Sequence, residues 1–274
     1  MNQNADRSKQ IEEQNKRIDE RLKIIKHRIA VFSGKGGVGK TTVAVNLSYA
    51  LLKKKKKVGL LDSDITGPNV PKMVGADIPP GVDEKSKQIT PQTKNDLQII
   101  SIAPMVPSES PVIWRGPLRS GAISQFLSDV VWGELDYLLA DLPPGTGDEV
   151  LTVGQKMKPH MAIVVTTPQE VSLIDCRRAV NMARKMNIQK VGVVENMSGL
   201  ICPHCNKEID IFDTGGGENM AKQMNADFLG RIPMEIETRT SCDNGKPVVL
   251  YAPESKTAKA FNSIADNVIK VLGN

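Results

Sequence analysis

Long hydrophobic runs and aromatic side chains are both scarce in this chain of 274 residues. No apolar run approaches the roughly 18 residues that a membrane-spanning helix needs, so we expect no membrane span. Aromatic residues make up only 4% of the chain, which argues against single-stranded nucleic-acid binding because such binding uses stacked rings. The polar first 20 residues carry both charges and do not resemble a secretory signal peptide, so a cytoplasmic location is predicted.

Cysteine is scarce as well, with four residues at positions 176, 202, 205 and 242. In a chain of this size without secretory features, such cysteines point to metal binding or chemistry before structural disulfides. Hydrophobic residues make up 40% and charged residues 24%, which excludes disordered and collagen-like classes. The length is that of one or two domains.

The formal charge of +5 is concentrated in two short segments. Residues 1–28 hold eight basic and five acidic residues, and Lys53–Lys57 adds five lysines, so the rest of the chain is slightly acidic. We interpret Lys53–Lys57 as the solvated end of a helix, where cations offset the helix dipole. A nucleic-acid or anionic-membrane patch is the alternative. No nucleic-acid partner is predicted.

The order of the predicted elements favours an α/β fold, a doubly wound, mostly parallel sheet with helices on both faces. Several strands are continuous runs of β-branched residues and Leu, as buried parallel strands are. The predicted strands are 28–33, 58–62, 97–103, 137–141, 161–167, 191–196 and 228–232. The predicted helices are 41–54, 116–131, 148–157, 171–186, 216–225 and 257–272.

Residues 1–27 are predicted to be a polar helical extension in front of this domain, which covers residues 28–274. Ile11, Ile18, Leu22 and Ile25 recur at helical spacing and share one face of the extension. Within the domain, residues 76–96 are expected to form an irregular excursion or a small hairpin, and residues 198–213 an insertion that carries two cysteines.

A phosphate-binding motif lies between the first strand and the first helix of the domain. The motif G-x-x-x-x-G-K-[ST] is matched by Gly34, Lys35, Gly36, Gly37, Val38, Gly39, Lys40 and Thr41. Its glycines let backbone N–H groups approach phosphate oxygens, and the helix N-terminus adds positive potential. Lys40 is expected to reach the β- and γ-phosphates and Thr41 to ligate Mg²⁺, with Thr42 next to them. The motif predicts a P-loop NTPase that binds ATP.

Three carboxylates complete the predicted nucleotide site. Asp62 ends the second strand and Asp64 follows it, while Asp141 ends a later strand. The carboxyl ends of parallel strands meet at the edge that holds the phosphate loop. Asp64 is the candidate that orients the attacking water, Asp62 lies near the magnesium shell, and Asp141 is the Walker B carboxylate. Residues 143–147 then form a switch loop. Strand capping or turn formation is the alternative for Asp62 and Asp64.

Cys202 and Cys205 form a C-x-x-C pair that allows three interpretations. A dithiol redox motif needs a helix N-terminus in a thioredoxin-like unit, which this insertion does not suggest. A bland surface loop is the second. The third is half of a metal site, because a zinc or iron–sulfur site usually takes four ligands. A symmetric dimer supplies four thiolates at its axis. Cys176 is expected to be buried in a helix, and Cys242 to be a spare thiol in a loop.

Taken in order, these motifs resemble the Mrp/ApbC family of iron–sulfur carrier P-loop ATPases. The resemblance rests on GKGGVGKTT at 34–42, DSDITGPNVPKM at 62–73, WRGP at 114–117, DLPPGTGDE at 141–149, TTPQEVSL at 166–173, ENMSG at 195–199, CPHC at 202–205 and CDNGKPVV at 242–249. It spans nearly the whole chain after residue 27. The KGGVGKTT form of the loop is similar to the deviant Walker A of MinD-like, SIMIBI-class ATPases.

The resemblance implies a homodimer with ATP between its subunits, in which Lys35 reaches the partner's nucleotide and Asn196 reads the adenine edge. It also implies that Cys202 and Cys205 hold a bridging [4Fe–4S] cluster, which is donated to apo-proteins. The alternatives are a MinD-like positioning or membrane-cycling ATPase, whose last helix carries an apolar stripe, and zinc as a staple at the dimer axis. Open at this stage are the recipient proteins, the cluster donor, whether hydrolysis drives loading or release, and the roles of Cys242 and residues 1–27.

Overall fold

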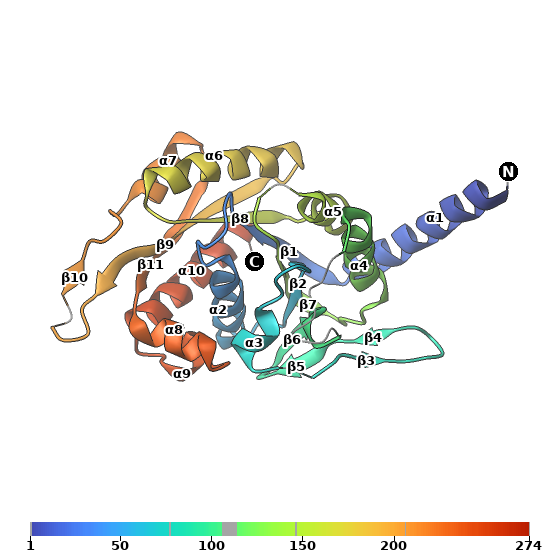
Figure 1. Ribbon diagram of the computed structural model, residues 1–274, viewed down its shortest axis with the longest axis horizontal. Coiled ribbons are helices and arrows are strands. Elements are labelled where there is room, and N and C mark those ends of the chain that lie inside the picture. Colours follow the sequence, from blue (N-terminus) through green and yellow to red (C-terminus); the bar gives the residue numbers. More distant parts are fainter. Residues whose placement is uncertain (1, 77, 106–113, 146, 206, 274) are drawn as a thin grey trace.

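The computed structural model describes residues 2–76, 78–105, 114–145, 147–205 and 207–273, and these form a sheet of nine strands with helices on both faces (Figure 1). The parallel strands run in the order β11 (Asp227–Met234), β9 (Lys190–Ile201), β8 (Met161–Thr166), β1 (Ile25–Phe32), β7 (Leu135–Asp141), β2 (Val58–Asp62) and β6 (Leu97–Ile100). The predicted doubly wound α/β fold is therefore confirmed. Antiparallel β5 (Gln92–Lys94) extends the β6 edge.

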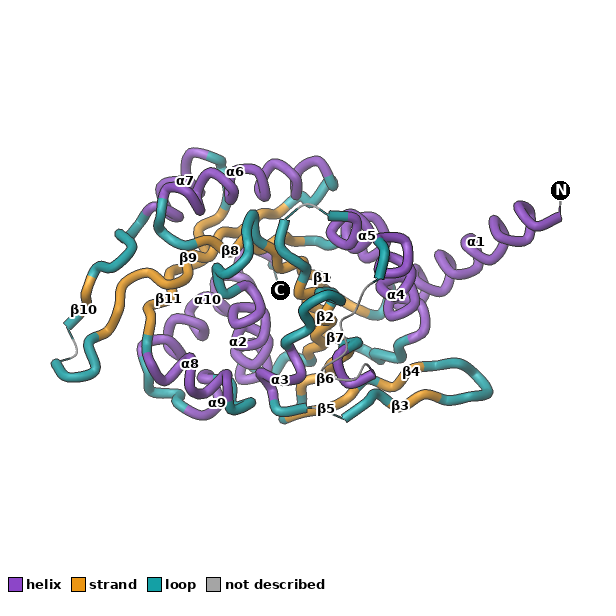
Figure 2. Tube along the Cα trace, viewed as in Figure 1, coloured by secondary structure: helices purple, strands orange, loops and turns teal. Residues whose placement is uncertain are grey.

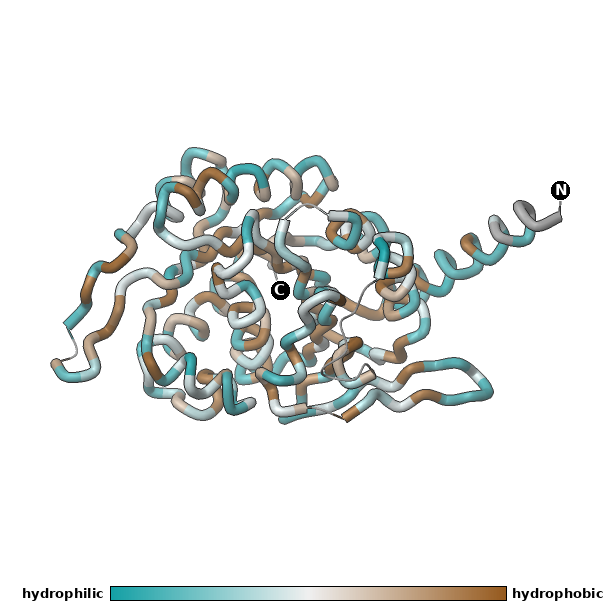
Figure 3. The backbone as a smooth tube through the Cα atoms, viewed as in Figure 1, coloured by the Kyte–Doolittle hydropathy of each residue, from teal (hydrophilic) through white to brown (hydrophobic). Residues whose placement is uncertain are grey.

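Each face of the sheet has its own hydrophobic core, which is why the central strands are apolar on both sides. One face is covered by α4 (Gly116–Asp129), α5 (Asp148–Met157), α6 (Glu170–Lys185) and α7 (Gly216–Gln223). The other is covered by α2 (Lys40–Lys53), α3 (Val70–Val74), α9 (Val248–Tyr251) and α10 (Lys256–Leu272) (Figure 2). In Figure 3 the strands between these layers are largely brown, the colour of hydrophobic residues.

The N-terminal helix α1 (Asn2–Leu22) projects from the body and ends earlier than predicted (Figure 1). Its last turns pack on α4 and α5 through Ile18 and Leu22, which are 1% and 4% exposed, whereas Ile11 is 47% exposed. Ile25 is not in the helix: it begins β1 and pairs with Leu135 of β7. The prediction of a helix through residue 27 is wrong at this end, because Ile25 is buried as the first residue of a central strand.

Two hairpins extend beyond the layers (Figure 1). The segment predicted as an excursion contains β3 (Gly81–Val82) paired with β4 (Ile89–Thr90), so a small hairpin is confirmed there. The insertion is a second hairpin, in which the far end of β9 pairs with β10 (Glu208–Ile209). Strand β9 thus continues to Ile201, five residues past its predicted end, because its far end pairs with β10 and, at Leu200, with Met234 of β11.

The C-terminal stripe and the lysine run have structural roles. Phe261, Ile264, Ala265 and Val268 of α10 are at most 1% exposed and pack in the core with α2, so this face is not free for a membrane. Lys53 Nζ donates to the Val249 carbonyl (3.0 Å), and Lys54 pairs with Asp266 of α10 (2.6 Å). Within the described segments, no helix combines the length and apolarity that crossing a membrane requires.

Candidate functional site

The phosphate loop connects β1 in the middle of the sheet to α2. Gly37 and Gly39 adopt left-handed backbone conformations, with φ of 80° and 81°, which favour glycine. A Cβ on Gly37 would meet nothing within 4 Å, so the loop leaves an open concavity there. A Cβ on Gly39 would instead collide with the Asn196 amide. The glycine positions therefore follow from the backbone that the loop needs to approach phosphate oxygens.

Lys40, Thr41 and Asp141 meet at the start of α2. Lys40 Nζ donates to Asp141 Oδ1 and Thr41 Oγ1 donates to Asp141 Oδ2, each at 2.7 Å. The side chains of Lys40 and Asp141 are only 7% and 1% exposed. Burial raises the pKa of Asp141, and the neighbouring Lys40 ammonium opposes that rise. A hydroxyl and a carboxylate side by side are the donor set that a Mg²⁺ ion at a phosphate site takes, so the residues fit the predicted metal.

Asp62 lies beside Asp141 because the two residues are register partners on adjacent strands β2 and β7. Its carboxylate is fully buried and accepts from Ser101 Oγ (3.0 Å) and from the Val70 amide (3.3 Å). Burial, and then the charge of Asp141, raise the pKa of Asp62 to about 8. Ser101 was missed by the sequence reasoning, although its place directly after β6, at the carboxyl edge of the sheet, could have indicated it.

Asp64 and Lys35 lie at the same edge. Asp64 accepts from Thr66 Oγ1 (3.0 Å) and from the Gly67 amide (3.2 Å), so it stabilises a turn, as the alternative interpretation had it. Lys35 is half-buried, and its carbonyl accepts from Ser33 Oγ (2.8 Å). The orientation of water by Asp64 and the reach of Lys35 to a partner's nucleotide stay predictions. Thr146 of the predicted switch loop lies outside the described residues.

Asn196 of β9 lies against the phosphate loop. Its Nδ2 donates to the Val38 carbonyl (2.8 Å), and its side chain is buried. It lines a cavity of about 700 Å³ together with Thr42, Met73 and Met234. The cavity begins at the phosphate loop and is largely apolar, which suits a flat aromatic base. That Asn196 reads the base stays a prediction.

The four cysteines have different surroundings. Cys202 is half-buried and Cys205 exposed, both at the tip of the β9–β10 hairpin, whereas Cys176 and Cys242 are buried. Backbone amides of His204 and Cys205 lower the pKa of the Cys202 thiol, while burial raises that of Cys176 to about 12. Cys242 was predicted in a loop, which is wrong: it lies in α8 (Ile236–Asp243), packed near Asn46.

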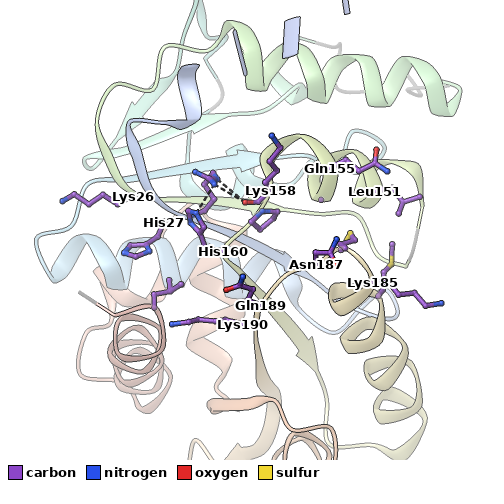
Figure 4. Close-up of a pocket in the computed structure, with 16 residues that line it drawn as sticks. Lys26, His27, Leu151, Gln155, Lys158, His160, Lys185, Asn187, Gln189 and Lys190 are labelled. Carbon is purple, nitrogen blue, oxygen red and sulfur yellow. Dashed lines mark hydrogen bonds between the residues drawn. The ribbon is translucent and has the colours of Figure 1, made fainter. Parts of the chain in front are cut away.

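A larger cavity, about 1100 Å³, lies at the opposite, amino edge of the strands (Figure 4). Its lining is basic, and two of the cations, Arg28 and Lys190, satisfy the carboxyl ends of helices. Arg28 donates to the Leu22 carbonyl at the end of α1 (3.2 Å) and to the Lys158 carbonyl after α5 (3.3 Å). Lys190 donates to the Val271 carbonyl near the end of α10. Arg28 and Lys190 therefore have a structural role at this edge of the sheet.

A phosphate loop after a central parallel strand, with its lysine and threonine bonded to the acidic residue of the adjacent strand, defines a P-loop NTPase. Comparison with known proteins makes this more specific. The family model described as NUBPL iron-transfer P-loop NTPase matches residues 24–269, and the chain belongs to this family. The resemblance inferred from the motifs is thereby confirmed.

Relatives and solved structures agree with that assignment. The chain is 51% identical over 263 residues to the iron–sulfur cluster carrier protein of Pyrococcus horikoshii, covering 90% of this chain and 87% of the relative. The carrier protein of Methanocaldococcus jannaschii is also 51% identical, over 248 residues, which cover 89% and 84% of the two chains.

Among solved structures, a nucleotide-binding protein from Archaeoglobus fulgidus in complex with ADP has a TM-score of 0.75 at 38% identity, covering 85% of this chain and 92% of that one. The cell division ATPase MinD of Pyrococcus furiosus has a TM-score of 0.66 at 26% identity, covering 90% and 99%.

Proposed function

We propose that this chain is an ATP-binding and ATP-hydrolysing homodimer that carries a [4Fe–4S] cluster between its subunits and delivers it to apo-proteins in the cytoplasm. One observation carries the proposal: the same chain presents an assembled phosphate-binding site and an accessible C-x-x-C pair on a projecting hairpin. The name of the relatives from P. horikoshii and M. jannaschii, iron–sulfur cluster carrier protein, supports the delivery role.

On the nucleotide side, the backbone amides of the phosphate loop and Lys40 hold the phosphates of ATP. Thr41 and Asp141 hold Mg²⁺, which when bound neutralises charge on the phosphate oxygens. Lys40 Nζ lies 2.7 Å from Asp141 Oδ1, so the lysine that holds the phosphates also lies beside the carboxylate that holds the metal. Asp64 orients the attacking water, and Lys35 contributes across the dimer interface.

On the cluster side, Cys202 and Cys205 from each of two subunits supply four thiolates, the ligand number that a [4Fe–4S] cluster takes. Within the described residues, no group of three or more His, Cys, Asp and Glu side chains is arranged to hold a metal ion in one chain. Two observations suit a transferable cargo: the lowered pKa of the Cys202 thiol favours the thiolate, and the exposure of Cys205 gives an acceptor protein access.

Anaerobic reconstitution with iron and sulfide tests this function. The wild type is expected to gain a broad visible absorbance and about four iron and four sulfide per dimer. Cys202→Ala and Cys205→Ala are expected to lose both, because each leaves two thiolates per dimer. Cys242→Ala is the matched control, since Cys242 is buried in α8 and is expected to keep the cluster. Full cluster occupancy in Cys202→Ala or Cys205→Ala refutes the proposal, and zinc in place of iron supports a structural staple instead.

A further inference from the structure

The hairpin that carries the cysteines leaves the body and rejoins it at a single place. Strand β9 pairs with β8 as far as Glu195, and with β11 at Asn196 and once more at Leu200, before it continues outward to the cysteines. The chain passes Cys202 and Cys205, returns through β10 and enters α7 at Gly216. We call residues 197–214 the cysteine arm (Figure 1). Glu195 and Asn196 are the last two residues before the arm, and Leu200 of the arm still pairs with Met234 of β11.

One side of this root contacts the phosphate loop. Asn196 Nδ2 donates to the Val38 carbonyl (2.8 Å), so the strand end is bonded to the loop backbone. The next residue, Met197, lies against Gly39, because a Cβ placed on Gly39 would be 3.8 Å from Met197 Cε. A displacement of the backbone at Val38 and Gly39 therefore alters the contacts of Met197, the first residue of the arm.

The other side of the root is fixed by a buried carboxylate. The Glu195 side chain is fully buried, and it accepts from Ser198 Oγ (2.6 Å) and from the amides of Gly215 (3.0 Å) and Gly217 (2.5 Å). Ser198 is the second residue of the arm, and Gly215 directly follows the arm. One carboxylate thus bonds both ends of the arm to β9. Arg231 Nε, at 4.0 Å, is the nearest cation in the described part of the chain.

Successive residues of a strand face opposite sides of a sheet, and here the two sides contact different parts of the protein. Glu195 faces α7, whose Met220 and Ala221 belong to one core, while Asn196 faces the loop before α2, which belongs to the other. The strand end therefore links the phosphate loop on one face to the base of the cysteine arm on the other, through adjacent residues.

We infer that Glu195 is a positioning residue that couples the nucleotide state of the phosphate loop to the mobility of the cysteine arm. The inference deepens the proposed function and rests on it for its biological meaning. With the carboxylate in place, both ends of the arm follow the end of β9, and the end of β9 follows Val38. Without it, the returning end of the arm at Gly215 is released from β9 while Leu200 stays paired with β11, and the phosphate loop no longer controls the arm as a unit.

Hydrogen–deuterium exchange of the full-length, metal-free protein tests this coupling without any cluster. Exchange in peptides from residues 197–214 is compared with and without saturating Mg-ADP. In the wild type, nucleotide is expected to slow exchange in the arm several-fold. Glu195→Gln turns an amide group toward one of the backbone donors, so exchange in the arm is expected to rise on the order of ten- to a hundredfold. The slowing by nucleotide is expected to disappear.

Glu218→Gln is the matched control, because it also replaces one negative carboxylate by an amide. Glu218 lies in α7, and among the described residues it pairs only with Lys222 and Arg231. It is expected to keep the wild-type response to nucleotide. Ser198→Ala removes one donor only and is expected to weaken the response partly. It also serves as the test if Glu195→Gln does not fold.

Two results overturn the inference. The first is that the arm of the wild type exchanges at the same rate with and without nucleotide. The second is that Glu195→Gln raises exchange in the arm while nucleotide still slows that exchange by the same factor as in the wild type. If Glu195→Gln does not fold, Ser198→Ala takes its place in this second comparison. The second result would mean that Glu195 has only a structural role. Because no iron is present, neither result depends on whether the chain carries a cluster, and the reconstitution experiment can fail or succeed separately.

Discussion

Replacement of Lys40 by Met is expected to destabilise the nucleotide-free protein, besides weakening nucleotide binding. Lys40 is the cation that contacts Asp141 in a place where both side chains are almost fully buried. Removal of one partner of such a pair leaves a buried carboxylate without compensation, which costs about 3–5 kcal/mol. For a domain of this size, each 1 kcal/mol moves the unfolding temperature by about 2–4 °C, so a fall of about 6–20 °C is predicted.

The pH dependence of this loss follows from the same carboxylate. Without Lys40, Asp141 can avoid an unpaired charge by taking up a proton, so the cost of that protonation limits the penalty. From the ordinary pKa of 3.8, the limit is about 5 kcal/mol at pH 7.5 and about 2 kcal/mol at pH 5. A carboxyl whose pKa is raised by folding destabilises the protein more as pH rises, so the penalty is expected to shrink as pH falls.

Thermal unfolding without nucleotide, at pH 7.5 and pH 5, measures both effects. The double variant Lys40→Met/Asp141→Asn is the control, because it removes the charge that Lys40 compensates, and it is expected to unfold within about 1 kcal/mol of the wild type. Equal unfolding temperatures for Lys40→Met and the wild type at pH 7.5 would refute the reasoning. A penalty that persists in full in the double variant would refute it as well.

Three further predictions follow from particular residues. Asp64→Asn is expected to lower ATP turnover on the order of 10²–10⁴-fold while ADP binding changes little, and unchanged phosphate release would count against Asp64 as the residue that orients water. Ile18→Ala is expected to cost about 2–5 kcal/mol of unfolding free energy and Ile11→Ala close to nothing, because the two side chains are 1% and 47% exposed; equal losses in denaturant unfolding would contradict the docking of α1. Burial lowers the pKa of His160 to about 4, so the unfolded state binds more protons than the folded state between pH 6.5 and 4, and the free energy of unfolding is expected to fall as pH falls through that window. His160→Gln should flatten this dependence of stability on pH, and an unchanged dependence would exclude His160 as its source.

The centre of the fold could be predicted from the sequence because local and tertiary signals agree there. Strand β2 and helix α5 have the predicted bounds, 58–62 and 148–157. Both have sharp ends: Asp62 follows an apolar run, and α5 begins with two acidic residues that favour a helix N-terminus. The nucleotide residues were found for a related reason, since the phosphate loop and the carboxylates after β2 and β7 occupy one edge of any parallel sheet.

The errors occur where the pattern fits two structures. Ile25 continues the helical stripe of α1 and also suits a strand. It lies in the strand because it pairs with Leu135, which is remote in sequence. Helix α8 has no apolar face that a sequence pattern reveals, so Cys242 was placed in a loop. Glu195 was missed because its role depends on hydrogen bonds from the amides of Gly215 and Gly217, which lie about 20 residues further along the chain and approach it only in the folded structure.

Native mass spectrometry of the anaerobically reconstituted protein tests the central claim most directly, because it reports chains and cluster in one mass. We expect a dimer that carries one [4Fe–4S] cluster, and we expect both the dimer and its iron to be lost in Cys202→Ala. A monomer that holds the metal by itself, or a dimer with a zinc ion in place of the cluster, would contradict it.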